Sequence, residues 1–214
     1  MEDTVEALLF DLGRVIFDLD TMRVHARWAK LAGIGVADIE QRYYRRVIGS
    51  EPIRRHERGE ISDSEFFNHL RGALEFDLTD EQVLDGWNAI FVGEMPGIRR
   101  ILFRAQEKLP LYVLSNTNFA HQAYWSVRFA ELLTPFRKIY VSNEMGTRKP
   151  EVAAFQAVVA DMGVAPQRIL FFDDMAANIA GARASGLRVV HVTATADVER
   201  ALSGLVPDLD DAPG

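Results

Sequence analysis

Three aspartates follow directly after short apolar runs in this chain of 214 residues. Asp11 follows the run Ala7–Phe10, and Asp173 and Asp174 follow the run Arg168–Phe172. Apolar runs of this length are typical of strands buried on both faces of a parallel sheet, whereas a carboxylate is costly to bury unless it is paired. We therefore expect the three aspartates at the carboxyl edge of a sheet, where the strands open into a solvated cleft.

Two further apolar runs also end in polar residues. Leu111–Leu114 is followed by Ser115 and Asn116, and Lys138–Val141 is followed a few residues later by Lys149. If all four strands are parallel, their ends bring a hydroxyl group and an ammonium group to the same edge as the three carboxylates. Two carboxylates about 4 Å apart repel by roughly 4 kcal/mol at an effective dielectric constant near 20, so a divalent cation would relieve the repulsion. Magnesium suits such a site because it binds carboxylate and carbonyl oxygens and leaves room for a phosphate group.

A long insertion separates the first two apolar runs. It spans about a hundred residues, whereas a strand–helix–strand unit needs only about 30. Its spacing is helical rather than alternating, and Ser62 and Thr79 each begin a sequence typical of a helix capping box. We predict a helical cap domain of about four helices over residues 20–88, inserted into a core domain formed by residues 1–19 and 89–214.

The second half of the chain alternates between apolar runs and helical segments. Helices are predicted from Pro150 to Met162 and from Ala176 to Ser185, and Leu187–Val192 is the fifth predicted strand. This alternation is typical of the α/β class. The predicted core is a doubly wound, parallel, Rossmann-like sheet.

The composition narrows the classes of partner. A net charge of −7 argues against nucleic acid, whose phosphates are held by clustered positive charge. The chain has no cysteine, which excludes disulfides and thiolate metal sites, and its five histidines show no paired spacing typical of zinc ligands. The N-terminal segment is acidic with only four consecutive apolar residues, so we expect neither a signal peptide nor a membrane anchor, and a cytoplasmic protein. The oligomeric state is not indicated.

Four motifs follow one another along the chain: Phe10-Asp-Leu-Gly, Leu114-Ser-Asn-Thr-Asn, Gly146-Thr-Arg-Lys-Pro-Glu and Phe171-Phe-Asp-Asp-Met-Ala-Ala-Asn-Ile. In this order they resemble the motifs of the haloacid dehalogenase (HAD) superfamily, and the resemblance covers nearly the whole chain. A closer similarity is to the bacterial α-D-glucose-1-phosphate phosphatase group. That group shares the Asp-Leu-Gly opening and the segments that correspond here to residues 56–62 and 86–91.

The resemblance implies a magnesium-dependent phosphatase that acts on a small phosphorylated metabolite, and the expected substrate is a sugar phosphate such as glucose-1-phosphate. It implies an aspartyl-phosphate intermediate on the first aspartate. The implied catalytic residues are Asp11, Lys149 and Ser115, and the implied metal ligands are Asp11, the carbonyl group of Gly13, Asp173 and Asp174. The substrate-binding candidates are Ser115, Asn116, Lys149 and, from the cap, His56 and Arg58. Asn178 is expected to orient the aspartates, and the roles of Arg14 and Met175 stay open.

Gly13 departs from the pattern that the superfamily resemblance implies, because most superfamily phosphatases carry a second aspartate there. That aspartate protonates the leaving oxygen and later activates water, and such acid–base help is worth about 10²–10⁴-fold in rate. We therefore expect either a preference for phosphates on acidic leaving groups or an acid supplied by the cap, with His56 the candidate.

Other interpretations stay open. The segment Asp18-Leu19-Asp20-Thr21 also fits the superfamily's opening motif, although it falls where a turn to the cap is expected. A carbon–halogen hydrolase would use Asp11 without a metal, but two further acids at the site argue against it. A non-catalytic protein that binds a phosphorylated metabolite is the third alternative.

Overall fold

A computed structural model describes residues 4–206, so the ends of the predicted core domain, residues 1–3 and 207–214, lie outside the described residues. Five parallel strands form the central sheet in the order β5-β4-β1-β6-β7. The strands are β1 (Ala7–Phe10), β4 (Leu111–Ser115), β5 (Phe136–Val141), β6 (Ile169–Asp173) and β7 (Arg188–His191). This confirms the predicted α/β fold with a parallel sheet.

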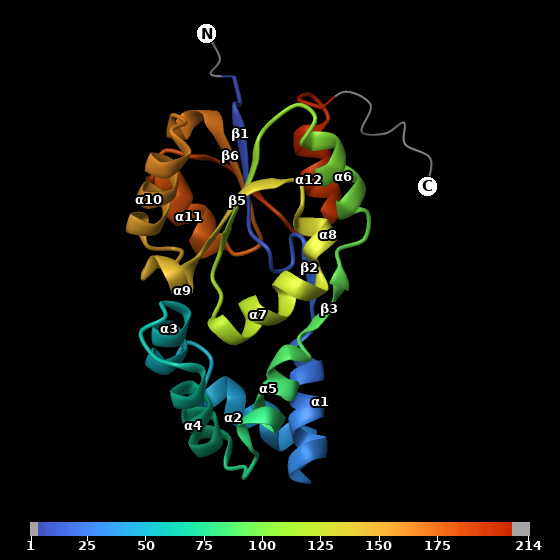
Figure 1. Cartoon of the computed structure of the whole chain (residues 1–214), viewed down its shortest axis with the longest axis vertical. Coiled ribbons are helices and arrows are strands. Elements are labelled where there is room, and N and C mark those ends of the chain that lie inside the picture. Colours follow the sequence, from blue (N-terminus) through green and yellow to red (C-terminus); the bar gives the residue numbers. More distant parts are fainter. Residues whose placement is uncertain (1–3, 207–214) are drawn as a thin grey trace.

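Helices cover both faces of the sheet (Figure 1). One face packs against α6 (Ile98–Ala105), α8 (Ala130–Leu133) and α12 (Thr195–Leu202), and the other against α10 (Val152–Met162) and α11 (Ala176–Ala184). A short helix, α9 (Ser142–Met145), follows β5, and a 3₁₀ helix, Pro166–Arg168, precedes β6. Because β1 lies in the middle, all four of its residues are fully buried, which explains its uninterrupted apolar sequence.

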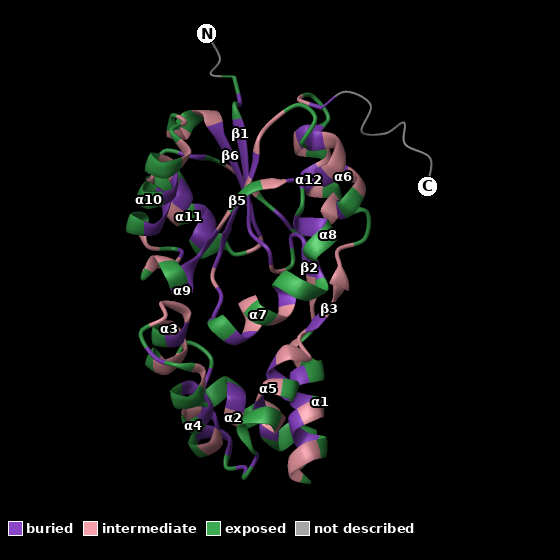
Figure 2. Cartoon of the chain, in the orientation of Figure 1, coloured by how far each residue is buried: buried purple, intermediate pink, exposed green. Residues whose placement is uncertain are grey.

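The cap consists of five helices that enclose a hydrophobic core of their own (Figures 1 and 2). They are α1 (Thr21–Ala32), α2 (Val36–Arg46), α3 (Glu51–Glu57), α4 (Asp63–Leu74) and α5 (Asp80–Asn88). Ser62 and Thr79 form the capping boxes that the sequence predicts at the starts of α4 and α5. Trp28, Phe66 and Trp87 belong to the cap core, where the ring of Trp87 packs against the rings of the other two.

An antiparallel ribbon of β2 (Phe17–Leu19) and β3 (Phe91–Glu94) joins core and cap. Asp18 belongs to β2, and Asp20 is the N-cap of α1, where its side chain accepts a hydrogen bond from the backbone of Met22. The alternative opening motif is therefore part of the connection to the cap. Helix α7 (Phe119–Arg128) bridges the two regions, because Ala120 packs in the cap core and Trp125 in the sheet core.

A glycine in α5 makes room for the central tryptophan of the cap. A Cβ atom on Gly86 would lie 2.1 Å from Cδ1 of Trp28, whose side chain is fully buried. We expect Gly86→Ala to lower the free energy of unfolding, measured by urea denaturation, by about 1–3 kcal/mol, the usual cost of overpacking. Gly72→Ala in α4 is the control, because nothing lies within 4 Å of the added methyl group and alanine favours a helix. An equal loss in both variants would contradict this packing.

Candidate active site

The ends of three parallel strands bring the predicted acids and hydroxyl to one edge. Asp11 follows β1 directly, Ser115 is the last residue of β4, and Asp173 is the last residue of β6 with Asp174 next to it. Lys149 reaches the same edge from the segment between α9 and α10. The parallel direction of the strands therefore places residues that are up to 163 positions apart in one site.

Lys149 is the centre of this arrangement. Its Nζ atom lies 2.8 Å from Oδ1 of Asp11 and 2.7 Å from Oδ2 of Asp173, and its side chain is only 1% exposed. Asp173 also accepts hydrogen bonds from the side chain of Asn178 and from the backbone N–H of Met175. With its oxygens bound in this way, Asp173 holds the ammonium group of Lys149 against Asp11.

Burial and repulsion by neighbouring carboxylates raise the pKa values of Asp11 and Asp174. Burial raises the pKa of Asp11 to about 7; Lys149 opposes this shift, whereas Asp173 and Asp174 add to it. The pKa of Asp174 is also raised, first by burial and then by the charge of Asp173. Burial acts to lower the pKa of Lys149, but Asp11 and Asp173 outweigh it, so the amine stays protonated. The site thus holds one cation among three carboxylates.

The three aspartates fit a divalent cation. One carboxylate oxygen from each of Asp11, Asp173 and Asp174 can be chosen so that the three lie within 4.8 Å of one another. Lys149 balances only one of the three negative charges, and hard carboxylate oxygens are the ligands that magnesium prefers. Gly13 lines the same cleft as Asp11 and Asp174, and its carbonyl group stays a predicted ligand.

A cleft opens in front of the aspartates between the core and the cap. Its walls come from the β1–β2 loop, from α3, from the Lys149 segment and from the turn after β6. The lining residues include Asp11, Gly13, Arg14, Arg54, Glu57, Asn116, Arg148, Lys149, Asp174 and Asn178. Arg14, whose role the sequence leaves open, adopts a left-handed conformation with φ of 57° and lies exposed at the rim with Met175.

Of the two predicted polar residues at the end of β4, Asn116 lines this cleft and Ser115 does not. The side chain of Asn116 accepts a hydrogen bond from the backbone N–H of Lys149 and donates one to its carbonyl group, both at 2.9 Å. Asn116 therefore fixes the backbone of Lys149 while it also lines the cleft. Ser115 is 4% exposed and lines a small recess next to the cleft.

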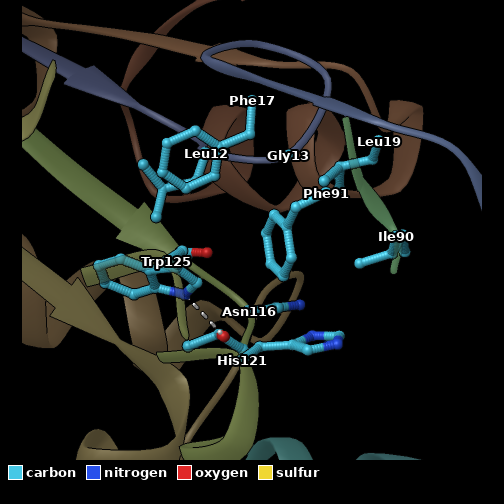
Figure 3. Close-up of a pocket in the computed structure, with 11 residues that line it drawn as sticks. Leu12, Gly13, Phe17, Leu19, Ile90, Phe91, Asn116, His121 and Trp125 are labelled. Atoms are coloured by element: carbon cyan, nitrogen blue, oxygen red, sulfur yellow. Dashed lines mark hydrogen bonds between the residues drawn. The ribbon is translucent and has the colours of Figure 1, made fainter. Parts of the chain in front are cut away.

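That recess lies beneath Gly13 and is mainly apolar (Figure 3). Phe17, Leu19, Phe91 and Trp125 surround it, and a Cβ atom on Gly13 would lie 2.9 Å from Cδ1 of Leu19. The space next to the missing side chain at position 13 is thus occupied by Leu19. No carboxylate from the described residues lines this recess.

His121 also lines the recess but is fully engaged. Its Nε2 atom lies 3.1 Å from the carbonyl oxygen of Trp87, and its Nδ1 atom lies 3.3 Å from the side-chain amide of Asn118. Burial lowers the pKa of His121 to about 4. At neutral pH its imidazole is therefore uncharged and has no proton to give to a substrate.

The structure does not bring His56 and Arg58 to the cleft. His56 is fully buried in the cap, where its Nε2 atom lies 2.7 Å from Asp63 and its ring stacks on Phe66. Arg58 pairs with Glu151 of the core. Both side chains make contacts within or beside the cap, and neither lines the cleft as predicted from the sequence.

Glu57 lies between His56 and Arg58 in the sequence and was not predicted as a site residue. It lines the cleft, and its Oε2 atom accepts a hydrogen bond of 2.6 Å from Nε of Arg148. Successive residues of a helix point about 100° apart, so His56 can face the cap interior while Glu57 faces the cleft. The spacing of Ile53, Arg54 and Glu57, which all line the cleft, is the signal of one shared helix face.

Residues 5–186 match the family model of haloacid dehalogenase-like hydrolases. The chain belongs to this family and is a hydrolase. It is 29% identical to the D-ribitol-5-phosphate phosphatase of Bacteroides thetaiotaomicron over 82% of this chain and 85% of that protein. It is 28% identical to a phosphatase of Mycobacterium tuberculosis over 98% of this chain and 99% of that protein.

Solved structures agree with this assignment. A HAD family enzyme of Bacteroides thetaiotaomicron in complex with magnesium and inorganic phosphate has a TM-score of 0.75 and 29% identity, over 89% of this chain and 95% of that chain. A dehalogenase with a TM-score of 0.66 is only 15% identical over 90% of this chain and 87% of that chain, and therefore shows the fold alone.

Among the residues that the structure describes, no helix is long and apolar enough to cross a membrane.

Proposed function

We propose that this protein is a magnesium-dependent phosphatase that removes phosphate from a small sugar or polyol phosphate through an aspartyl-phosphate on Asp11. The observation that carries the proposal is the position of Lys149, whose ammonium group touches both Asp11 and Asp173 beside the third acid, Asp174. The named activities of two relatives and the magnesium and phosphate bound to a structural neighbour support it.

The residues have separate tasks in this reaction. An oxygen of Asp11 attacks the phosphorus atom, and the oxygen of the metabolite leaves. Lys149 balances charge on Asp11 and on the phosphoryl oxygens, while Asp173 and Asn116 hold its side chain and backbone in place. Bound magnesium would neutralise negative charge on the aspartates and the phosphate. Water then hydrolyses the aspartyl-phosphate and restores Asp11.

The charge of the site disfavours the alternative of carbon–halogen hydrolysis. In that reaction a bare carboxylate attacks carbon without a metal, and two extra carboxylates close to the nucleophile would serve no purpose. Burial also raises the pKa of Asp11 to about 7, and a bound divalent cation would favour its ionised form at neutral pH. A non-catalytic binding protein is disfavoured because the nucleophile and the ammonium group lie in contact.

The proposed substrate class rests on the cleft and on the relatives. Arg14, Arg54 and Asn116 offer hydrogen-bonding groups to the hydroxyl groups of a sugar or polyol. Phosphate release should be measured for glucose-1-phosphate, glucose-6-phosphate and D-ribitol-5-phosphate, with magnesium and with EDTA. We expect magnesium-dependent release from at least one of them. Equal rates for the two glucose phosphates would argue against a preference for acidic leaving groups, and no release from any would argue against the proposal.

Magnesium should stabilise the folded protein through the aspartate cluster. A ligand at a hundredfold excess over its Kd adds about 2.7 kcal/mol to the free energy of unfolding, so Tm should rise when magnesium replaces EDTA. Asp174→Asn should abolish this rise because it removes a ligand. In EDTA the variant should unfold at a higher temperature than the wild type, because burial and Asp173 make the charge of Asp174 unfavourable. A full magnesium shift in the variant would contradict the proposed site.

A further inference from the structure

Cleavage of an ordinary phosphate ester needs a proton for the leaving oxygen, because an alkoxide is a poor leaving group. Within the described cleft, the carboxylates are Asp11, Asp174 and Glu57. Asp11 is the proposed nucleophile, and Asp174 belongs with Asp173 to the proposed metal site. Glu57 is therefore the lining carboxylate that has no other task in the reaction.

The surroundings of Gly13 offer no carboxylate or charged imidazole that could protonate the leaving oxygen. The adjoining recess is mainly apolar, and its imidazole, His121, is neutral with both nitrogens engaged. His56, the candidate named from the sequence, is buried in the cap on Asp63. The carboxylate that remains among the described lining residues lies on the cap side of the cleft, where α3 presents Glu57.

We propose that Glu57 is the general acid and general base of the phosphatase reaction. The inference rests on the proposed function and adds a residue that reaches the reacting atoms from the cap. As Asp11 bonds to phosphorus and the bond from phosphorus to the leaving oxygen breaks, protonated Glu57 gives its proton to that oxygen, and the free alcohol leaves. Glu57, now a carboxylate, takes a proton from water while the water oxygen bonds to phosphorus. The bond from phosphorus to Asp11 breaks, and orthophosphate and protonated Glu57 result.

The contacts of Glu57 suit this exchange. Arg148 donates to Oε2 only, and no described group donates to Oε1, so that atom is available to a substrate. Burial raises the pKa of Glu57, against the opposing charges of Arg148, His56 and Lys149. Tyr43 of the cap lies close enough to interact electrostatically with Glu57. The carboxyl group thus holds a proton more readily than an exposed glutamate would.

Glu57 also belongs to the contacts that hold the cap against the core at the cleft. Two ion pairs join the end of α3 to the start of the α10 region, Glu57 with Arg148 and Arg58 with Glu151. At the turn after α3, a Cβ atom on Gly59 would lie 2.2 Å from the carbonyl oxygen of Asn143, so the cap backbone touches the core there. The first ion pair lies in the cleft and the second beside it.

The test compares Glu57→Gln with Glu151→Gln, which removes the same charge from the second cap–core ion pair. Two substrates are used: p-nitrophenyl phosphate, whose leaving group needs no proton, and glucose-6-phosphate, whose leaving group does. For Glu57→Gln we expect kcat/KM to fall about 100-fold with glucose-6-phosphate and to change little with p-nitrophenyl phosphate. With p-nitrophenyl phosphate the same variant should show a burst of about one product per active site, because water is no longer activated. Glu151→Gln should change kcat/KM by the same factor for both substrates and should give no burst.

Two outcomes would overturn the role of Glu57. One is an equal change in kcat/KM for both substrates, including no change, and the other is a rise in KM alone, as expected for a residue that only binds substrate. If Glu57→Gln does not fold, Glu57→Asp takes its place. The role of Glu57 then requires that kcat/KM falls more for glucose-6-phosphate than for p-nitrophenyl phosphate. Wild-type enzyme without magnesium-dependent release from p-nitrophenyl phosphate would instead contradict the proposed function itself.

Discussion

Asp11→Asn should abolish phosphatase activity, with a loss of about 10⁴-fold or more in kcat, because an amide oxygen cannot form the covalent intermediate. The measurement is release of p-nitrophenolate and of orthophosphate in saturating magnesium. The substitution preserves shape, and the backbone N–H of Leu12, which donates to Oδ1 of Asp11 at 2.8 Å, still finds an acceptor. The loss would therefore be chemical.

The same variant has a second readout that separates loss of chemistry from loss of folding. Burial raises the folded-state pKa of Asp11 from 3.8 to about 7, so its ionisation favours the unfolded state. Without metal, its contribution to stability is complete below pH 3.8 and is lost as the pH rises to 7. In EDTA at pH 8, Asp11→Asn should thus unfold at a higher temperature than the wild type. A variant that is inactive but less stable would contradict this account of the site's charge.

Lys149→Met should damage both the fold and the reaction. The side chain is buried between Asp11 and Asp173, and removing one member of a buried ion pair typically costs 3–5 kcal/mol. We expect the free energy of unfolding in EDTA to fall by about that amount, as measured by urea denaturation. Activity should be lost, because the phosphoryl oxygens would no longer have the ammonium group of Lys149 to balance their charge.

A double variant provides the control for Lys149. In Lys149→Met with Asp173→Asn, the second carboxylate is neutral, so part of the lost stability should return, while activity stays absent. The coupling between the two sites should exceed 1 kcal/mol, because the groups are in contact. Strictly additive losses would mean that the ion pair has no energetic role.

The sequence predicts the sheet well because its three central strands, β1, β4 and β6, are almost wholly buried. Runs such as Ala7–Phe10 and Ile169–Phe172 are uninterrupted in their hydrophobicity, and helical segments separate the later ones. The ribbon of β2 and β3 escapes detection because each strand has only three or four residues. The cap helices also separate its two strands in the sequence, so no local sequence pattern indicates that the strands pair.

The site is partly predictable for a related reason. Residues at strand ends share an edge as soon as the strands are parallel, so Asp11, Asp173 and Lys149 could be grouped from the sequence before any coordinates. Residues of the cap could not be grouped in this way. His56 and Glu57 are neighbours on α3, and only the packing of the cap against the core decides that Glu57 lines the cleft while His56 lies inside.

The central claim is that Asp11 carries the phosphoryl group during turnover. The most direct measurement is mass spectrometry of acid-quenched enzyme taken during steady-state turnover of p-nitrophenyl phosphate with magnesium, followed by sequencing of the peptide that contains Asp11. We predict a phosphoryl group on Asp11, more of it in Glu57→Gln, and none in EDTA. Turnover by the wild type with Asp11 unmodified at every quench time, together with activity in Asp11→Asn, would contradict the account.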